Sequence, residues 1–191
     1  MNLSEQDYVL VGLLLAAVYF DITSKKIPNK ITMPAILIGI IWSTVNSGLN
    51  GFLFSIFGFL LGLAVFFIPY MSGGIGAGDV KLMAAIGALK GWKFTLFSSL
   101  GTAIAGGLIV LIYTIYMSSL KITLIKALGL IVKPLAKGIF KVSGNKKSLE
   151  TIQYFEKIKM EKRNDYIPYA LAIAIGSFVI LFSDITNLFY I

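Results

Sequence analysis

Residues 52–70 read FLFSIFGFLLGLAVFFIPY, an apolar run that contains no charged side chain. A run of this length can cross the hydrocarbon core of a bilayer as one α-helix. Further apolar runs lie on both sides of it, at about 8–20, 31–45, 94–117 and 166–182. Short polar segments separate most of these runs, which is the pattern of a multi-pass membrane protein. The sequence therefore predicts an all-α membrane fold.

The composition agrees with this fold and excludes several functions. The chain has 191 residues, of which 57% are hydrophobic and 14% charged, whereas soluble domains are about 45–50% apolar. It contains no cysteine and no histidine, which excludes a thiol nucleophile, a Ser-His-Asp triad and an ordinary Cys/His zinc site. We therefore expect neither a metal nor a cofactor.

The net charge of +8 does not indicate a nucleic-acid partner, because membrane proteins concentrate Lys and Arg in their cytoplasmic loops. A shorter apolar segment, 80–89, precedes the polar break at 90–93, and counting it separately gives about six transmembrane helices. With six spans, 15 of the 17 basic residues fall on one side, in three segments: 21–30, 72–81 and 118–165. The positive-inside rule places this side in the cytoplasm and both termini outside. Five spans would put segment 118–165 opposite segment 21–30, which fits the rule less well.

We thus expect residues 1–191 to form a single membrane-embedded domain of the cytoplasmic membrane, with a basic cytoplasmic segment at about 118–165. This segment holds ten Lys and one Arg. Its charge has three interpretations: it follows from topology alone, it lies on anionic membrane lipid, or it helps to recruit a substrate.

Two aspartates stand at predicted helix ends on the same side. Asp21 closes the first apolar run, where a solvated carboxylate at the membrane interface is the simplest interpretation, although negative charge is unfavourable at a helix C-terminus. Asp79 follows four nearby glycines, Gly73, Gly74, Gly76 and Gly78. Its simplest interpretation is an N-cap, but a cap does not require so many residues that permit close approach of the backbone.

If the two helices adjoin, the carboxylates of Asp21 and Asp79 can share a water molecule. Two close carboxylates do not both ionise easily, so one of them keeps a proton. The ionised group can then activate the water while the protonated group polarises a peptide carbonyl. This chemistry is that of an aspartic protease, and it needs neither metal nor histidine.

The residues around both aspartates resemble a known family. Two segments carry the resemblance: Asp21-Ile22-Thr23-Ser24-Lys25-Lys26-Ile27-Pro28-Asn29 and Gly76-Ala77-Gly78-Asp79-Val80-Lys81-Leu82, with Asp79 58 positions after Asp21. They resemble the motifs of the type IV prepilin peptidase family, intramembrane aspartic proteases of the GxGD type. The later Ile167-Pro168-Tyr169-Ala170 is similar to the opening of that family's last helix.

The resemblance implies that Asp21 and Asp79 are the catalytic pair and that Gly76 and Gly78 shape the site. Lys81 matches a family position, where it would tune a carboxylate or reach lipid headgroups. It also implies that the enzyme cleaves the short leader from prepilin-like or archaellin-like precursors at the cytoplasmic membrane face. These precursors and membrane lipid would be its partners.

The larger members of this family carry an N-terminal methylation domain that bears cysteines, and nothing similar precedes the first apolar run here. We therefore expect the short form, without N-methylation of the product. Two other functions stay open. A small transporter or channel would also use intramembrane carboxylates and broken helices, and an inactive assembly factor would keep the fold.

Overall fold

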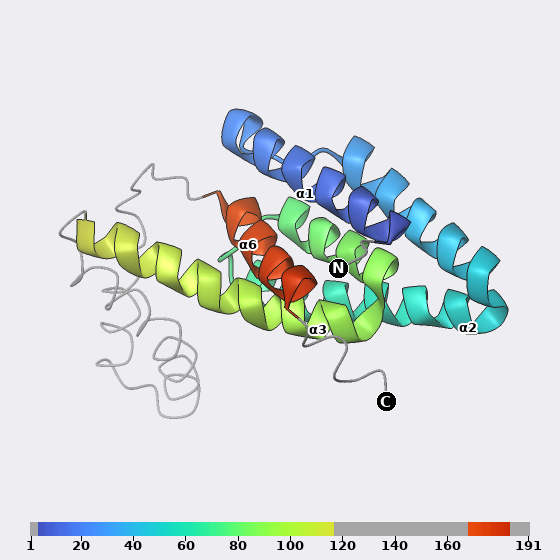
Figure 1. The fold of residues 1–191 in the computed structure, drawn as a ribbon. Coiled ribbons are helices and arrows are strands. Elements are labelled where there is room, and N and C mark those ends of the chain that lie inside the picture. Colours follow the sequence, from blue (N-terminus) through green and yellow to red (C-terminus); the bar gives the residue numbers. More distant parts are fainter. Residues whose placement is uncertain (1–3, 117–167, 184–191) are drawn as a thin grey trace, which may run out of the picture. The chain divides into compact units, whose positions relative to one another are not determined.

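A computed structural model describes residues 4–116 and 168–183 of the chain, and Figure 1 shows its fold. Every regular element in this part is a helix: α1 (Glu5–Ser24), α2 (Asn29–Met71), α3 (Ala77–Tyr116) and α6 (Tyr169–Phe182). The basic segment 118–165 lies outside the described residues. The chain divides into two compact units, Met1–Ile109 with Ile167–Ile191 and Val110–Tyr166. Both aspartates belong to the first unit.

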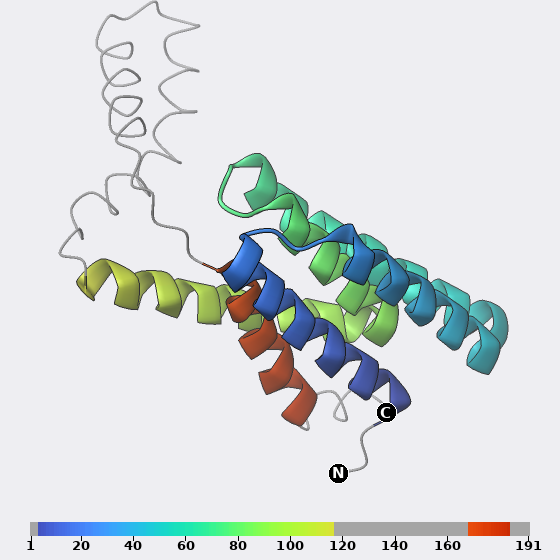
Figure 2. The same ribbon diagram turned by 90° about the horizontal axis from the view of Figure 1, so that it is seen from above.

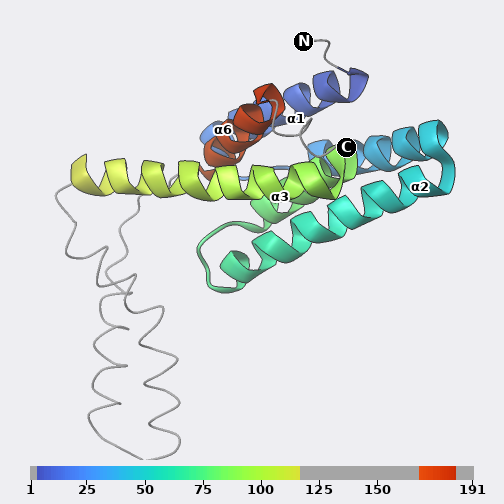
Figure 3. The ribbon, with the colours of Figure 1, turned by 60° about the horizontal axis from the view of Figure 1, so that its bottom comes forward.

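Two glycines break the long helices at the places where the sequence predicts turns. Gly48 has φ 57° and ψ −135° inside α2, and Gly91 has φ 74° and ψ 179° inside α3. A positive φ costs glycine little because it has no Cβ. The chain reverses at Gly48, so the two halves of α2 lie side by side (Figure 3). Across this hairpin, the Ser55 hydroxyl donates to the Gly39 carbonyl at 3.1 Å.

Three of the described helices are long and apolar enough to cross a membrane: α1, α2 and the part of α3 up to Ile112. The fourth, α6, is apolar but shorter. Large apolar side chains are exposed along their outer faces, including Leu15, Ile41 and Leu60. An apolar surface of this extent suits a lipid environment. The all-helical prediction is confirmed for the described residues, whereas the count of about six spans is not.

The first half of α3 lies at the centre of the first unit. Its apolar residues are fully buried in a continuous run: Leu82, Met83, Ala84, Ala85 and Ile86. A helix that is apolar on all sides is buried on all sides, which explains why this segment is hydrophobic although it is short for a span. The sequence had suggested that this helix begins at Val80, but it begins at Ala77.

Small residues allow the helices to approach closely around this central segment. A Cβ on Gly58 would lie 2.7 Å from the Gly91 carbonyl carbon, and one on Gly176 would lie 2.7 Å from the Gly101 carbonyl carbon. Close backbone contact between small residues is a common way to pack membrane helices. The second half of α3 is thereby held against α6, which also packs against α1 (Figure 2).

An ion pair joins α1 to α3 at the end of the helices far from Asp21. The Lys90 ammonium donates to Asp7 Oδ1 at 2.7 Å, and the two side chains are 20% and 9% exposed. Asp7 also accepts hydrogen bonds from the backbone N–H and the hydroxyl of Ser4, which caps α1. This pairing fixes the start of α1 beside the break at Gly91.

Candidate active site

Asp21 lies in the last turn of α1, because this helix continues to Ser24 rather than ending at residue 20. The helix ends where Lys25 adopts a left-handed conformation and its N–H bonds to the Asp21 carbonyl at 3.1 Å. The Asp21 side chain is buried, with 3% of its surface exposed. The simple interpretation of a solvated helix-end carboxylate is therefore wrong.

The start of α6 supplies a partner for this buried carboxylate. The backbone N–H of Ala170, in the first turn of α6, donates to Asp21 Oδ2 at 3.0 Å. The first N–H groups of a helix lack partners within it and carry partial positive charge, so they favour an anion. Asp21 thus lies at the C-terminal end of α1, where a negative charge is unfavourable, and beside the N-terminal end of α6, where it is favourable.

Asp79 is the third residue of α3, since the helix begins at Ala77. The N-cap interpretation is therefore wrong by three positions: Gly76 immediately precedes the helix, and its N–H donates to Asp79 Oδ2 at 2.9 Å. Asp79 is 7% exposed, and its other oxygen, Oδ1, is buried without a hydrogen-bond partner among the described residues. Such an orphaned polar atom is rare in folded proteins and often marks a functional site.

The fold brings the two aspartates together. The loop that follows Asp21 packs on the start of α3, where Ile27 lies against Gly78, and the Ala170 N–H at the start of α6 bonds to Asp21. The end of α1 and the starts of α3 and α6, which carry Asp21, Asp79 and Tyr169, thus lie close together, with both aspartates buried and Tyr169 half-buried. A pair of buried carboxyl groups, one of them with a free oxygen, can hold and activate a water molecule.

The motif glycines lie where a side chain would disturb this arrangement. A Cβ on Gly78 would be 3.0 Å from the Ile27 Cβ and 3.3 Å from the Ile27 backbone nitrogen. A Cβ on Gly76 would be 3.2 Å from Asp79 Oδ2. Gly78 therefore allows the loop after α1 to pack closely on the start of α3.

Lys81 does not contact either carboxylate among the described hydrogen bonds. Its ammonium group donates to the Asn29 side-chain oxygen at 2.9 Å, on an exposed surface. This bond ties the start of α3 to the start of α2. The bond tests neither role that the sequence suggested for Lys81, and it gives Asn29 a structural role that sequence reasoning did not assign.

Tyr169 and Ala170 are the site residues whose roles sequence reasoning missed. Residues 167–170 resemble the opening of the last helix in the family, and this resemblance marked them as notable. It did not show that they would contact Asp21. The Tyr169 hydroxyl lies beside Gly106, where an added Cβ would be 3.1 Å away from it. Within residues 4–116 and 168–183, no cluster of three or more His, Cys, Asp or Glu side chains could hold a metal ion.

The sequence that carries this site matches a known protein family. The model of the type IV leader peptidase family matches residues 8–111, which include both aspartates, Gly76, Gly78 and Lys81. The chain belongs to this family. The matched region ends within α3, so α6 and its contact with Asp21 lie beyond it.

Among curated proteins, the chain is similar to prepilin leader peptidase/N-methyltransferases. It is 31% identical over 109 residues to the protein of Legionella pneumophila, a match that covers 54% of this chain and 38% of that protein. It is 32% identical over 111 residues to the proteins of two Burkholderia pseudomallei strains, covering 55% of this chain and 36% of theirs. The match thus spans little more than a third of these relatives. No solved structure matches the chain.

Proposed function

We propose that this chain is an aspartic endopeptidase that removes the leader peptide from type IV prepilin-like or archaellin-like precursors at the cytoplasmic face of the membrane. The observation that carries the proposal is the burial of Asp21 and Asp79 at adjoining helix ends, in a member of the type IV leader peptidase family. Relatives named prepilin leader peptidases support the substrate class.

The two aspartates have different surroundings, which suit different roles. Asp21 Oδ2 accepts the Ala170 N–H at the start of α6, and Asp79 Oδ2 accepts the Gly76 N–H at the start of α3. Asp79 keeps one buried oxygen without a partner, which suits a protonated oxygen that donates to the substrate. We assign Asp21 as the general base and Asp79 as the general acid.

In the proposed reaction, Asp21 takes a proton from a water molecule as the water oxygen attacks the scissile carbonyl carbon. Asp79 donates its proton to the carbonyl oxygen, so the intermediate is a neutral gem-diol. The intermediate collapses when the C–N bond breaks. The leaving nitrogen then takes the proton held by Asp21, and one diol hydroxyl returns a proton to Asp79. Both carboxyl groups are restored to their starting forms.

We propose more membrane crossings than the three long apolar helices by themselves indicate. If each half of α2 and α3 crosses the membrane separately, these four segments together with α1 and α6 give six crossings. The ends that carry Asp21 and Asp79 then lie on the same side as most of the basic residues, which the positive-inside rule assigns to the cytoplasm. The leader of a precursor would reach the aspartates from this side while its apolar helix stays in the bilayer.

The test is cleavage of a precursor co-expressed with the full chain, read by gel shift and by N-terminal sequencing of the product. We expect the wild-type chain to cut at the leader boundary and Asp21→Asn and Asp79→Asn to leave the precursor intact. Glu5→Gln is the matched control, because it also removes one carboxylate but lies at the opposite end of α1. It should cut like the wild type.

Membrane expression of every variant is measured in parallel, so that loss of cleavage is separated from loss of protein. Cleavage by both aspartate variants at the wild-type rate would refute the site assignment. A transporter or channel would then be the better hypothesis, to be tested by flux through proteoliposomes. If the wild type leaves several leader-bearing precursors uncut, the proposed substrate class is wrong.

A further inference from the structure

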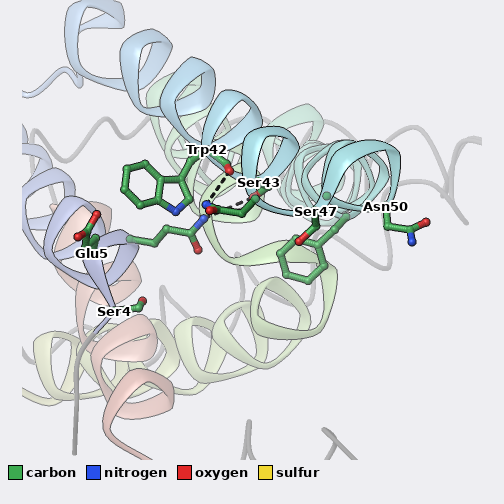
Figure 4. Close-up of a pocket in the computed structure, with 10 residues that line it drawn as sticks. Ser4, Glu5, Trp42, Ser43, Ser47 and Asn50 are labelled. Carbon is green, nitrogen blue, oxygen red and sulfur yellow. Dashed lines mark hydrogen bonds between the residues drawn. The ribbon is translucent and has the colours of Figure 1, made fainter.

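A polar cavity of about 590 Å³ lies at the opposite end of the helices from the aspartates. Figure 4 shows side chains that line it, with Ser4 and Glu5 from the start of α1 and Trp42, Ser43, Ser47 and Asn50 from α2. Along α1, Glu5 is separated from Asp21 by about 24 Å at 1.5 Å per residue. The cavity is therefore distinct from the candidate active site.

The polar groups in this cavity are oriented by the fold and partly free to bind a ligand. Gln6 donates to the Ser43 hydroxyl at 3.4 Å, and the amide nitrogen of Asn46 donates to the Trp42 carbonyl at 2.9 Å. The second bond turns the Asn46 side chain back along the helix and leaves its carbonyl oxygen available as an acceptor. Among the described residues that line the cavity, Glu5 is the one charged side chain.

An apolar groove of about 320 Å³ adjoins the cavity on the outer face of α2. Ile38, Ile41 and Val45 line this groove, and all three are exposed. Trp42 and Asn46 line both the groove and the polar cavity. The two spaces thus meet at one turn of α2, with polar groups on one side of that turn and apolar groups on the other.

We propose that this combined site binds one phospholipid with a primary-amine headgroup, such as phosphatidylethanolamine. The ammonium group would pair with Glu5 and donate to the Asn46 carbonyl oxygen. The phosphate oxygens would accept from the amide and hydroxyl groups of Gln6 and Ser43, and an acyl chain would lie in the groove beside Ile41. Trp42 would sit at the boundary, the depth that tryptophan prefers in membrane proteins.

Charge complementarity selects this occupant over an anionic lipid. A phosphatidylglycerol headgroup carries net negative charge and would meet the Glu5 carboxylate without a lining cation to offset the repulsion. An ethanolamine headgroup places an ammonium there instead and can donate hydrogen bonds to the carboxylate. The site is independent of the proposed peptidase activity, so the failure of one leaves the other standing.

The test uses Trp42 as a fluorescent reporter. The chain has two tryptophans, so Trp92→Phe leaves Trp42 alone. The full-length protein is purified in dodecyl maltoside and titrated with phosphatidylethanolamine or phosphatidylglycerol brominated on the acyl chain, which quenches tryptophan on contact. We expect phosphatidylethanolamine to reach half-maximal quenching at a mole fraction about two to five times lower than phosphatidylglycerol does. This ratio is the one expected from a single exposed ion pair.

Two substitutions at one position isolate the charge. Glu5→Gln should bring the two half-maximal mole fractions together, whereas Glu5→Asp, which keeps the carboxylate, should retain the preference. Equal quenching by both lipids in the parent protein would overturn the proposal, as would a preference that persists in Glu5→Gln. If Trp42 responded to an added precursor and to neither lipid, the groove would be a substrate surface and the lipid site would be wrong.

Discussion

Replacing Gly78 by alanine tests whether the loop after α1 sets the geometry of the aspartate pair. The added Cβ would lie 3.0 Å from the Ile27 Cβ and 3.3 Å from the Ile27 backbone nitrogen. Carbon atoms prefer separations of about 3.5–4.0 Å, so Ile27 must move by roughly 0.5–1 Å. The loop that contains Ile27 begins four residues after Asp21, and the shift therefore acts at the site.

The effect on stability is small because two terms oppose each other. Inserting a methyl group into a packed contact costs about 1–3 kcal/mol, whereas alanine gains about 0.5–1 kcal/mol over glycine in a helix. The effect on activity is larger, since a misplacement of about 1 Å can cost about 100-fold in rate. We expect Gly78→Ala to fold, to melt a few degrees lower and to cleave its precursor about 10- to 100-fold more slowly.

Cleavage rates of the purified variants, measured with melting curves in the same detergent, check this expectation. Gly107→Ala is the matched control, because it lies in the same helix and an added Cβ there meets nothing within 4 Å. Gly107→Ala should cleave like the wild type. If Gly78→Ala cleaved as fast as Gly107→Ala, the inference that this contact sets the spacing of the aspartates would be refuted.

Three further substitutions probe other contacts. Lys81→Met removes the exposed bond to Asn29 and should cost at most about 1 kcal/mol of stability; a complete loss of cleavage would instead indicate a direct role at the carboxylates. Asp7→Asn weakens the ion pair with Lys90 and should lower the free energy of unfolding by about 1–3 kcal/mol. A double-mutant cycle with Lys90→Met attributes this loss to the pair if the losses of the two single variants are not additive. Tyr169→Phe removes the hydroxyl of the residue that precedes Ala170, whose N–H bonds to Asp21. It should slow cleavage about tenfold, or about 1.4 kcal/mol of barrier, with little change in melting temperature; an unchanged rate would place Tyr169 outside the site.

Much of the fold follows from local signals in the sequence. The apolar runs predict the helices, and the breaks at Gly48 and Gly91 fall within the polar segments that interrupt these runs. At both breaks the chain reverses direction, so each break separates two helices that run in opposite directions. Helix ends were less predictable, since α1 extends beyond its apolar run in both directions.

In the candidate site, too, some features could be predicted from the sequence and others could not. The spacing and the shared side suggested that Asp21 and Asp79 meet, and the structure packs the loop after α1 on the start of α3, with both aspartates buried. Their catalytic role stays a prediction. The Ala170 N–H could not be foreseen, because a backbone donor has no sequence signature and its partner lies 149 residues away. The bond between Lys81 and Asn29 was equally hidden, since it depends on how the starts of two helices pack.

The distance in sequence between Asp21 and Ala170 also has a consequence for biosynthesis. A ribosome that adds about 5–20 residues per second needs about 7–30 s to add the 149 residues from Ile22 to Ala170. Throughout that interval the helix that carries Asp21 can already be in the membrane, while the amide that orients its carboxylate does not yet exist. A nascent chain therefore holds both aspartates before it holds the amide that bonds to Asp21. Under the proposed function, we expect no cleavage of a precursor before the last helix is inserted.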